Sequence, residues 1–348
     1  MDLLEIENLL KKAIANEREL LNLSNRNMTI LPSNIHQLCK VKKLLLNDNK
    51  LLMPPSEIMT LVQLEELTLD NNNFTMLPTG ISKLTNLKLL SVCHNPLNIL
   101  TPEIGQLTSL THLWLVECEF INIPEEIGCL SSLQTLSLKG NRLTSLPSTF
   151  GDLRMLRWCC LANNILDSLP KQFSNLKSLV YLDLNRNKFS SIPECLTDCV
   201  ELMSLHMTGN EVMSVSDDTL LALAKLTKFD LRDNAIQDKP DHWKGLDYIL
   251  VGKTGIEGLE EECNGLDVRA FIRGYPSDDD EGDEDDDDED DDDNNDDDDD
   301  DNEDDDEEEE VDNDESKEIN SEEKNALNKR ERKTDMHIET DEKDLTKS

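Results

Sequence analysis

Leucine and isoleucine recur at a fixed interval along most of this chain, with polar residues between them. The clearest stretch runs from Leu133 to Leu153, where Leu136 and Leu138 alternate with polar residues and Asn141 follows. A repeat of fixed length with the same apolar positions predicts one small structural unit stacked many times. The position of this Asn returns every 23 residues and is occupied by Asn49, Asn72, Asn95, Cys118, Asn141, Asn164, Asn187 and Asn210.

Each repeat predicts a short strand, a turn and a return segment. Apolar residues that alternate with polar ones, such as Leu113 and Leu115, indicate a strand with one face turned inward. An Asn amide both donates and accepts, so we expect a column of these side chains to bond the buried turns of neighbouring units. Apolar residues three apart, such as Ile127 and Leu130, indicate a short helix on the opposite side. A proline opens this segment in most units, at Pro32, Pro55, Pro78, Pro124, Pro147, Pro170 and Pro193.

Four regions follow from this pattern. Residues 1–19 are predicted to form an amphipathic helix that covers the open end of the first unit. Residues 20–257 are predicted to form an α/β solenoid of about 10–11 coils of 23 residues, with parallel strands on a concave face and short helical or extended segments on the convex face. In the ninth coil, Asp217 is expected to cap a more regular helix. Residues 258–276 are predicted to cap the far end, and residues 277–348 to form a disordered acidic tail.

Charge is distributed unevenly along the chain, whose formal net charge is −41. Residues 278–348 carry 41 acidic and 8 basic residues, whereas residues 1–277 carry 34 and 26. From residue 278 to residue 310, 29 of the 33 residues are Asp or Glu, and none is aliphatic or aromatic. Such a segment cannot bury enough apolar surface to offset its ordering entropy, which is the basis for predicting disorder.

Several function classes are not expected. The chain shows no signal peptide and no apolar run of 18 residues, so neither secretion nor a membrane span is predicted. The nine cysteines lie at repeat positions, which predicts reduced thiols and an intracellular protein; Cys159 should face inward and Cys160 outward. We expect the cytoplasm, with the nucleus as the alternative because residues 329–333 are basic. No catalytic or metal-binding constellation is found, so no enzyme activity, cofactor or metal is predicted.

The candidate site is the set of strand residues that point away from the leucine core. Outward positions are acidic in repeats three to five, at Glu66, Asp70, Glu117 and Glu119, and mainly basic in repeats six to eight. Two of the three tryptophans are expected to point outward, and exposed aromatic residues with Arg are typical of interface hot spots. The alternative is that these rings fill a curved surface without a partner. The predicted partner-binding residues are His112, Trp114, Lys139, Arg142, Trp158, Tyr181, Arg186, Lys188 and His206.

The repeat form x-x-Leu-Pro-x-x-Ile-x-x-Leu-x-x-Leu-x-x-Leu-x-Leu-x-x-Asn resembles the Ras-group class of intracellular leucine-rich repeat proteins. This class includes the Ras suppressor, the soc-2-type scaffold of Ras signalling and Scribble-type polarity scaffolds. Residues 13–32 resemble its entry from helix to first coil, and the resemblance extends over about residues 10–257. It implies a non-enzymatic scaffold or adaptor whose concave face binds small GTPases, phosphatases or other signalling proteins.

The acidic tail resembles a different group, the acidic nuclear phosphoprotein family. That likeness implies an alternative function, in which the tail binds histones or other basic proteins. The repeats depart from that family because they are more numerous and more regular. Direct binding of nucleic acid is not predicted under either interpretation.

Overall fold

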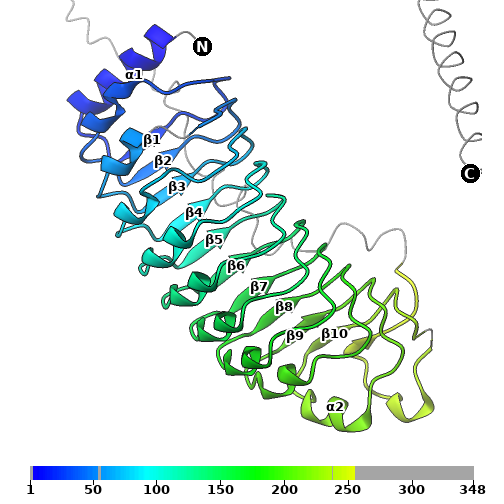
Figure 1. Ribbon diagram of the computed structural model, residues 1–348. Coiled ribbons are helices and arrows are strands. Elements are labelled where there is room, and N and C mark those ends of the chain that lie inside the picture. The colour runs from blue at the N-terminus through cyan, green and yellow to red at the C-terminus, as the bar shows by residue number, and fades with distance from the viewer. Residues whose placement is uncertain (1–2, 54–55, 237, 255–348) are drawn as a thin grey trace, which may run out of the picture. The chain divides into compact units, whose positions relative to one another are not determined.

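The computed structural model describes residues 3–53, 56–236 and 238–254 of the chain, so the predicted C-terminal cap and acidic tail lie outside the described residues. Within this part, the strands form one parallel sheet in which each strand pairs with the next in chain order (Figure 1). Coil n is defined here as the repeat that contains strand βn. The strands are β1 (Leu20–Asn22), β2 (Lys43–Leu45), β3 (Glu66–Thr68), β4 (Leu89–Ser91), β5 (His112–Trp114), β6 (Thr135–Ser137), β7 (Trp158–Cys160), β8 (Tyr181–Asp183), β9 (Ser204–His206), β10 (Lys228–Asp230) and β11 (Ile249–Leu250).

Short helices line the side of the coils opposite the sheet (Figure 1). Most are single 3₁₀ turns rather than α-helical turns, because a return segment of three to five residues favours the tighter i→i+3 bond. The α-helices of the described part are α1 (Leu3–Ala15) and α2 (Asp217–Ala222). The 3₁₀ helices are η1 (Ser33–Gln37), η2 (Ser56–Thr60), η3 (Ile81–Lys83), η4 (Pro102–Gln106), η5 (Glu125–Cys129), η6 (Ser148–Asp152), η7 (Lys171–Asn175), η8 (Glu194–Asp198) and η9 (Asp241–Trp243).

The core lies between the sheet and these helices. The inward strand residues and the apolar residues of the return segments are buried in coils 1 to 9, as Leu113, Leu115 and Ile127 show in the fifth. Phe150 and Phe173 stack between adjacent coils with ring centroids 5.7 Å apart. Because each coil buries its apolar side chains only against its neighbours, stability comes from the stack rather than from any single repeat.

A column of asparagines holds the turns together, as the sequence predicts. The Asn49 amide nitrogen donates to the carbonyls of Leu23, Leu46 and Asn47 at 2.9–3.1 Å. Its oxygen accepts the backbone N–H groups of Arg26 and Met28 at 3.1 and 3.0 Å. The side chain therefore satisfies backbone groups of two coils, and the same pattern recurs at Asn72, Asn95, Asn141, Asn164, Asn187, Asn210 and Asn234.

Cys118 replaces the asparagine in coil 5 and reproduces half of its role. Its thiol donates to the carbonyls of Val92 and Val116 at 3.4 and 3.5 Å. The backbone N–H of Leu97 donates instead to the Asn95 carbonyl at 2.8 Å. In the other coils the corresponding N–H donates to the next asparagine oxygen. The thiol here therefore keeps two of the three donor contacts and loses this acceptor contact.

Glycines bring the convex segments of coils 4 to 7 into backbone contact. A Cβ added at Gly151 would lie 2.1 Å from the carbonyl oxygen of Gln172. At Gly128 it would lie 2.3 Å from that of Thr149, and at Gly105 2.6 Å from that of Glu126. These distances are far below van der Waals contact, so only glycine permits the approach.

The ends of the array differ from expectation in one detail. Helix α1 buries Ile6, Leu10 and Ala13 against the first coil. The prediction of a capped helix in coil 9 is correct, but the capping residue is Ser216 rather than Asp217. The Ser216 hydroxyl accepts the backbone N–H of Thr219 at 3.2 Å, and Asp217 lies in the first turn. In the described ranges, no helix is long and apolar enough to span a membrane.

Candidate functional site

Three aromatic rings from neighbouring strands form a continuous shelf on the concave face, which is the side of the sheet turned away from the core. Trp158 and Tyr181 stack with ring centroids 5.4 Å apart and an interplanar angle of 6°. Tyr181 then meets His206 at 5.1 Å and 39°. The contact arises because Trp158 and Tyr181 are 23 residues apart and occupy paired positions of β7 and β8. Trp158 and Tyr181 are both partly exposed, so the shelf presents aromatic surface to a partner.

Trp114 does not lie where the sequence predicts. Its side chain is only 3% exposed and packs with Leu89, Cys93 and Val116 in a small apolar cluster separate from the main core. His112 stacks on it at 5.5 Å. The strand alternation correctly places Trp114 on the concave face, but the expectation of exposure is wrong because apolar residues of β4 and of the following turn cover it. Its indole nitrogen is buried without a hydrogen-bond partner.

Basic side chains lie along the edge of the concave face beside the shelf. Arg142 is exposed and pairs with Glu119 at 3.1 Å, and Lys188 pairs with Glu211 at 3.5 Å. Such exposed pairs contribute on the order of 0–1 kcal/mol, so a partner carboxylate can displace them at little cost. Lys139 is partly exposed and Arg186 is exposed. The stem of Arg186 passes close to Gly209, whose absent Cβ would lie 3.3 Å from the Arg186 Cγ.

The acidic half of the predicted surface is mostly engaged within the protein. Glu66 pairs with Lys43 at 2.9 Å, and Glu117 lies 3.2 Å from the His94 ring. Asp70 is buried rather than outward in solvent, which corrects the expectation. It accepts the Ser91 hydroxyl at 2.6 Å and the Cys93 backbone N–H at 2.7 Å. Burial nevertheless raises the pKa of Asp70 to about 6, because these bonds only partly offset the lost hydration.

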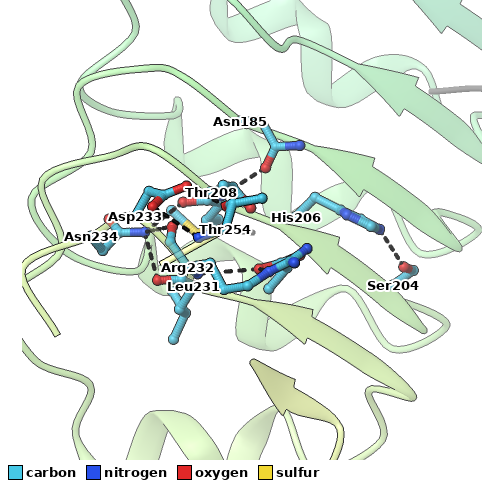
Figure 2. A network of polar contacts seen from close by, with 11 residues as sticks. Asn185, Ser204, His206, Thr208, Leu231, Arg232, Asp233, Asn234 and Thr254 are labelled. Atoms are coloured by element: carbon cyan, nitrogen blue, oxygen red, sulfur yellow. Dashed lines mark hydrogen bonds and ion pairs between the residues drawn. The ribbon is translucent and has the colours of Figure 1, made fainter. Parts of the chain in front are cut away.

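The last coils add a polar network that fixes the far end of the shelf. Figure 2 shows His206 directed toward Ser204, and the ring nitrogen and hydroxyl are 2.9 Å apart. Asn185 accepts the backbone N–H of Thr208 at 2.7 Å. Arg232 holds the buried carboxylate of Asp230 through its Nε at 2.9 Å and its Nη2 at 2.5 Å. The turn that follows is closed by a hydrogen bond between Asp233 and Thr254.

Burial disfavours the charged form of two histidines of the concave face, His112 and His206. Burial lowers the pKa of His206 despite the opposing effect of the nearby Asp183 carboxylate. Burial also lowers the pKa of His112, against a smaller opposing effect of Glu66. Both pKa values therefore lie below the ordinary value of about 6.5. His112 is partly exposed, whereas His206 is only 8% exposed, so the expectation that His206 faces a partner is wrong and its ring instead supports Tyr181.

Most cysteines of the described ranges are withdrawn from solvent, and only Cys39 and Cys129 are exposed. Cys160 is fully buried, with its sulfur 3.6 Å from the Asp183 carboxylate, so the prediction that it faces solvent is wrong. Desolvation raises the pKa of Cys195 to about 11 and that of Cys199 to about 12, which keeps both thiols protonated at neutral pH. No group of three or more His, Cys, Asp or Glu side chains in the described segments is placed to hold a metal ion.

Sequence reasoning found the aromatic residues but missed the partners that orient them. Ser204 positions His206, and Gly209 gives room to Arg186. The contact of Gly209 with Arg186 could have been found by aligning the repeats, because residues 23 apart are neighbours across the sheet, whereas Ser204 and His206 lie two residues apart on one strand and so share a face. The stacking of Trp158 on Tyr181 follows from the same alignment.

Comparison with known proteins agrees with this architecture. The family described as leucine-rich repeat region matches residues 92–244, and that described as leucine rich repeat matches residues 63–84. The structure of a leucine-rich repeat protein from Leptospira interrogans is 32% identical, with a TM-score of 0.64, and the match covers 70% of this chain and 68% of that one. The chain belongs to the leucine-rich repeat proteins.

Other leucine-rich repeat structures share the fold over a smaller part of their length. The plant peptide hormone receptor RGFR1 in complex with RGF2 is 28% identical, with a TM-score of 0.55; the match covers 62% of this chain and 36% of the receptor. The TLR13–ssRNA13 complex is 25% identical, with a TM-score of 0.61, covering 72% of this chain and 38% of that one. No curated protein matches the chain. The leucine-rich repeat fold is typically a non-enzymatic scaffold, and these repeats form a protein-interaction module.

Proposed function

We propose that this leucine-rich repeat protein is a non-enzymatic scaffold or adaptor that binds an intracellular signalling protein on its concave face. The observation that supports this most directly is the stack of Trp158 on Tyr181, which leaves aromatic surface partly exposed at the centre of the sheet. Aromatic and Arg side chains at the centre of a contact carry most of the binding energy in protein interfaces. A Ras-type GTPase or a phosphatase-linked protein is the partner class implied by the Ras-group repeat form.

The chemistry of the surface defines what the partner must present. The shelf offers flat apolar rings, so the partner should supply an apolar or aromatic side chain that covers them. Arg142, Arg186 and Lys188 lie on the exposed edge, so carboxylates should flank that side chain on the partner. The pairs that Arg142 and Lys188 already form, with Glu119 and Glu211, would exchange for partner carboxylates.

A quantitative pull-down from cell extract tests the proposal with matched baits. The bait Trp158→Ala/Tyr181→Ala removes the shelf, and Met155→Ala removes an exposed side chain of the same coil without touching the shelf. Partners bound through the concave face should fall at least about tenfold with the first bait and stay unchanged with the second. Circular dichroism should show that both baits remain folded.

Two results would contradict this function. One is a set of specific partners that survives loss of both aromatic side chains. The other is a set that both baits lose equally, since that would indicate general damage to the array. Loss of small GTPases or phosphatase subunits from the shelf bait alone would support the signalling assignment.

The tail gives a second candidate function, favoured by its sequence. With 41 acidic and 8 basic residues in residues 278–348, it should attract histones or other basic proteins electrostatically. Such a complex should weaken steeply between low and physiological salt, whereas an aromatic contact should change little. A bait of residues 1–277 that loses its partners, while the shelf variant keeps a set of basic proteins, would favour this function instead.

A further inference from the structure

One position of the repeat is exposed in coil after coil but changes its chemistry halfway along the array. It lies four residues after the repeat asparagine, on the flank of the coils, and is called the flank row here. Coils 1 to 4 carry apolar residues in this row, Ile30, Met53, Met76 and Ile99, which are 63%, 70%, 51% and 70% exposed. In coils 5 to 8 the same exposed position is occupied by Asn122, Ser145, Ser168 and Ser191.

Folding does not account for the apolar half of the row. The polar residues of coils 5 to 8 show that the repeat tolerates a hydrophilic side chain at this position, since the backbone places it in solvent either way. Leu52 and Ile121, which occupy the preceding repeat position, extend the apolar surface and are 62% and 53% exposed. The six side chains together present on the order of 700 Å², more than the roughly 300–600 Å² of the largest apolar patch on a typical monomer.

We propose that the apolar flank row is a self-association surface that joins two copies of this chain side by side in antiparallel order. The row reads Ile-Met-Met-Ile, which is the same in both directions. A twofold axis between coils 2 and 3 therefore places Ile30 of one copy opposite Ile99 of the other, and Met53 opposite Met76. A twofold interface uses the same patch on both copies, so each of these contacts is made twice, and apolar residues face apolar residues along the whole row.

The area reaches the size expected of a weak dimer. Covering the four paired row residues on both copies removes about 1,000 Å² from water, the lower limit for a specific interface. Methionine side chains adapt to one another without demanding a single shape, which suits the centre of such a contact.

The charges near the row also permit two acidic chains to approach. The turn positions that precede it hold Asn25 and Asn27 in coil 1, Asn71 and Asn73 in coil 3, and a histidine and a proline, at 94 and 96, in coil 4. In coil 2 the same positions carry one acidic and one basic residue, at 48 and 50. Glutamates occupy both positions only in coil 5, beyond the palindrome, at 117 and 119. The charge of residues 278–348 opposes association, so the dimer should become tighter as salt screens that repulsion.

Sedimentation velocity of the full chain tests the proposal. The intact protein should show a concentration-dependent dimer that is favoured at higher salt. Met53→Ser/Met76→Ser should raise the dissociation constant at least about a hundredfold, because each dimer loses four buried methionines. Serine already occupies the row in coils 6 to 8, so the variant should fold normally. Met213→Ser is the matched control, since it removes an exposed methionine of the distant coil 9 and should leave the dimer unchanged.

Cross-linking tests the antiparallel order independently. Chains carrying Ile30→Cys should form disulfide-linked dimers when mixed with chains carrying Ile99→Cys. Neither chain alone should exceed the background of the native exposed Cys39 and Cys129, because like positions would lie three coils, or about 14 Å, apart. A monomer at all concentrations and salts, a dimer insensitive to the methionine pair, or cross-linking of like chains only would overturn the proposal.

Discussion

Asp70 carries a testable cost to stability at neutral pH. Its carboxylate is buried on the concave side of coil 3, and its pKa is raised to about 6 from an ordinary value near 3.8. The folded protein therefore binds this proton more tightly than the unfolded chain. The contribution of Asp70 to stability should be greatest below about pH 4, should fall as the pH rises through 6, and should then level off. The change expected from a shift of about two pKa units is on the order of 2–3 kcal/mol.

The substitution Asp70→Asn isolates this effect. Both donors, the Ser91 hydroxyl and the Cys93 N–H, bond the same oxygen of Asp70, so an amide oxygen can replace it. Asn47 and Asn185 show the arrangement at equivalent positions, accepting the N–H groups of Asp70 and Thr208. The variant should be on the order of 2–3 kcal/mol more stable than the parent at pH 7.5, and no more stable at pH 3.5.

Urea denaturation of both proteins at the two pH values measures this difference directly. Both proteins contain the same other carboxylates, so the titration of those groups drops out of the difference between their free energies of unfolding. Asp48→Asn, an exposed substitution in the neighbouring coil, is the control and should change stability little at either pH. A gain from Asp70→Asn that is equal at both pH values, or a loss at pH 7.5, would refute the reasoning.

Two further perturbations test the architecture. Asn164→Ala removes one accepted and three donated hydrogen bonds to buried backbone groups, so the free energy of unfolding should fall by about 3–5 kcal/mol in a urea titration. Asn164→Cys should lower the free energy of unfolding less, as the thiol of Cys118 suggests, and the exposed substitution Asn122→Ala should leave it unchanged. An equal decrease in all three variants would contradict the role of the asparagine column. Gly151→Ala should lower stability by about 1–3 kcal/mol through overlap with Gln172, and an unchanged melting temperature would show that the convex turns can separate.

The regular part of the fold could be predicted from the sequence because period and chemistry agree in nearly every coil. The column of asparagines follows from one recurring side chain, and the strand register follows from the 23-residue interval. The 3₁₀ form of the return segments could not be read from apolar spacing, since residues three apart suit either helix type. The cap at Ser216 was missed because two aspartates follow it, and both serine and aspartate cap helices well.

The candidate site was harder to predict, since alternation assigns a face but not an exposure. Trp114 on β5 and Trp158 on β7 occupy the same face of the sheet, with one strand between them, yet only Trp158 remains partly exposed. The difference lies in the neighbours, because Leu89 and Cys93 cover Trp114 whereas Tyr181 supports Trp158 from one side. Cys160 and Asp70 were likewise assigned to the surface but are buried by the side chains around them.

The glycines at 105, 128 and 151 have a consequence for the bending of the array. The curvature of a stack depends on how far apart successive coils lie on the helical side compared with the strand side. Where backbones touch on the helical side, that spacing shrinks toward the fixed strand spacing of about 4.8 Å, and the array locally straightens. Coils 4 to 7 should therefore form a flat, stiff span between more strongly bent neighbours. The tryptophan–tyrosine shelf begins in coil 7, at the end of this span, so a partner would bind to a part of the sheet that bends little.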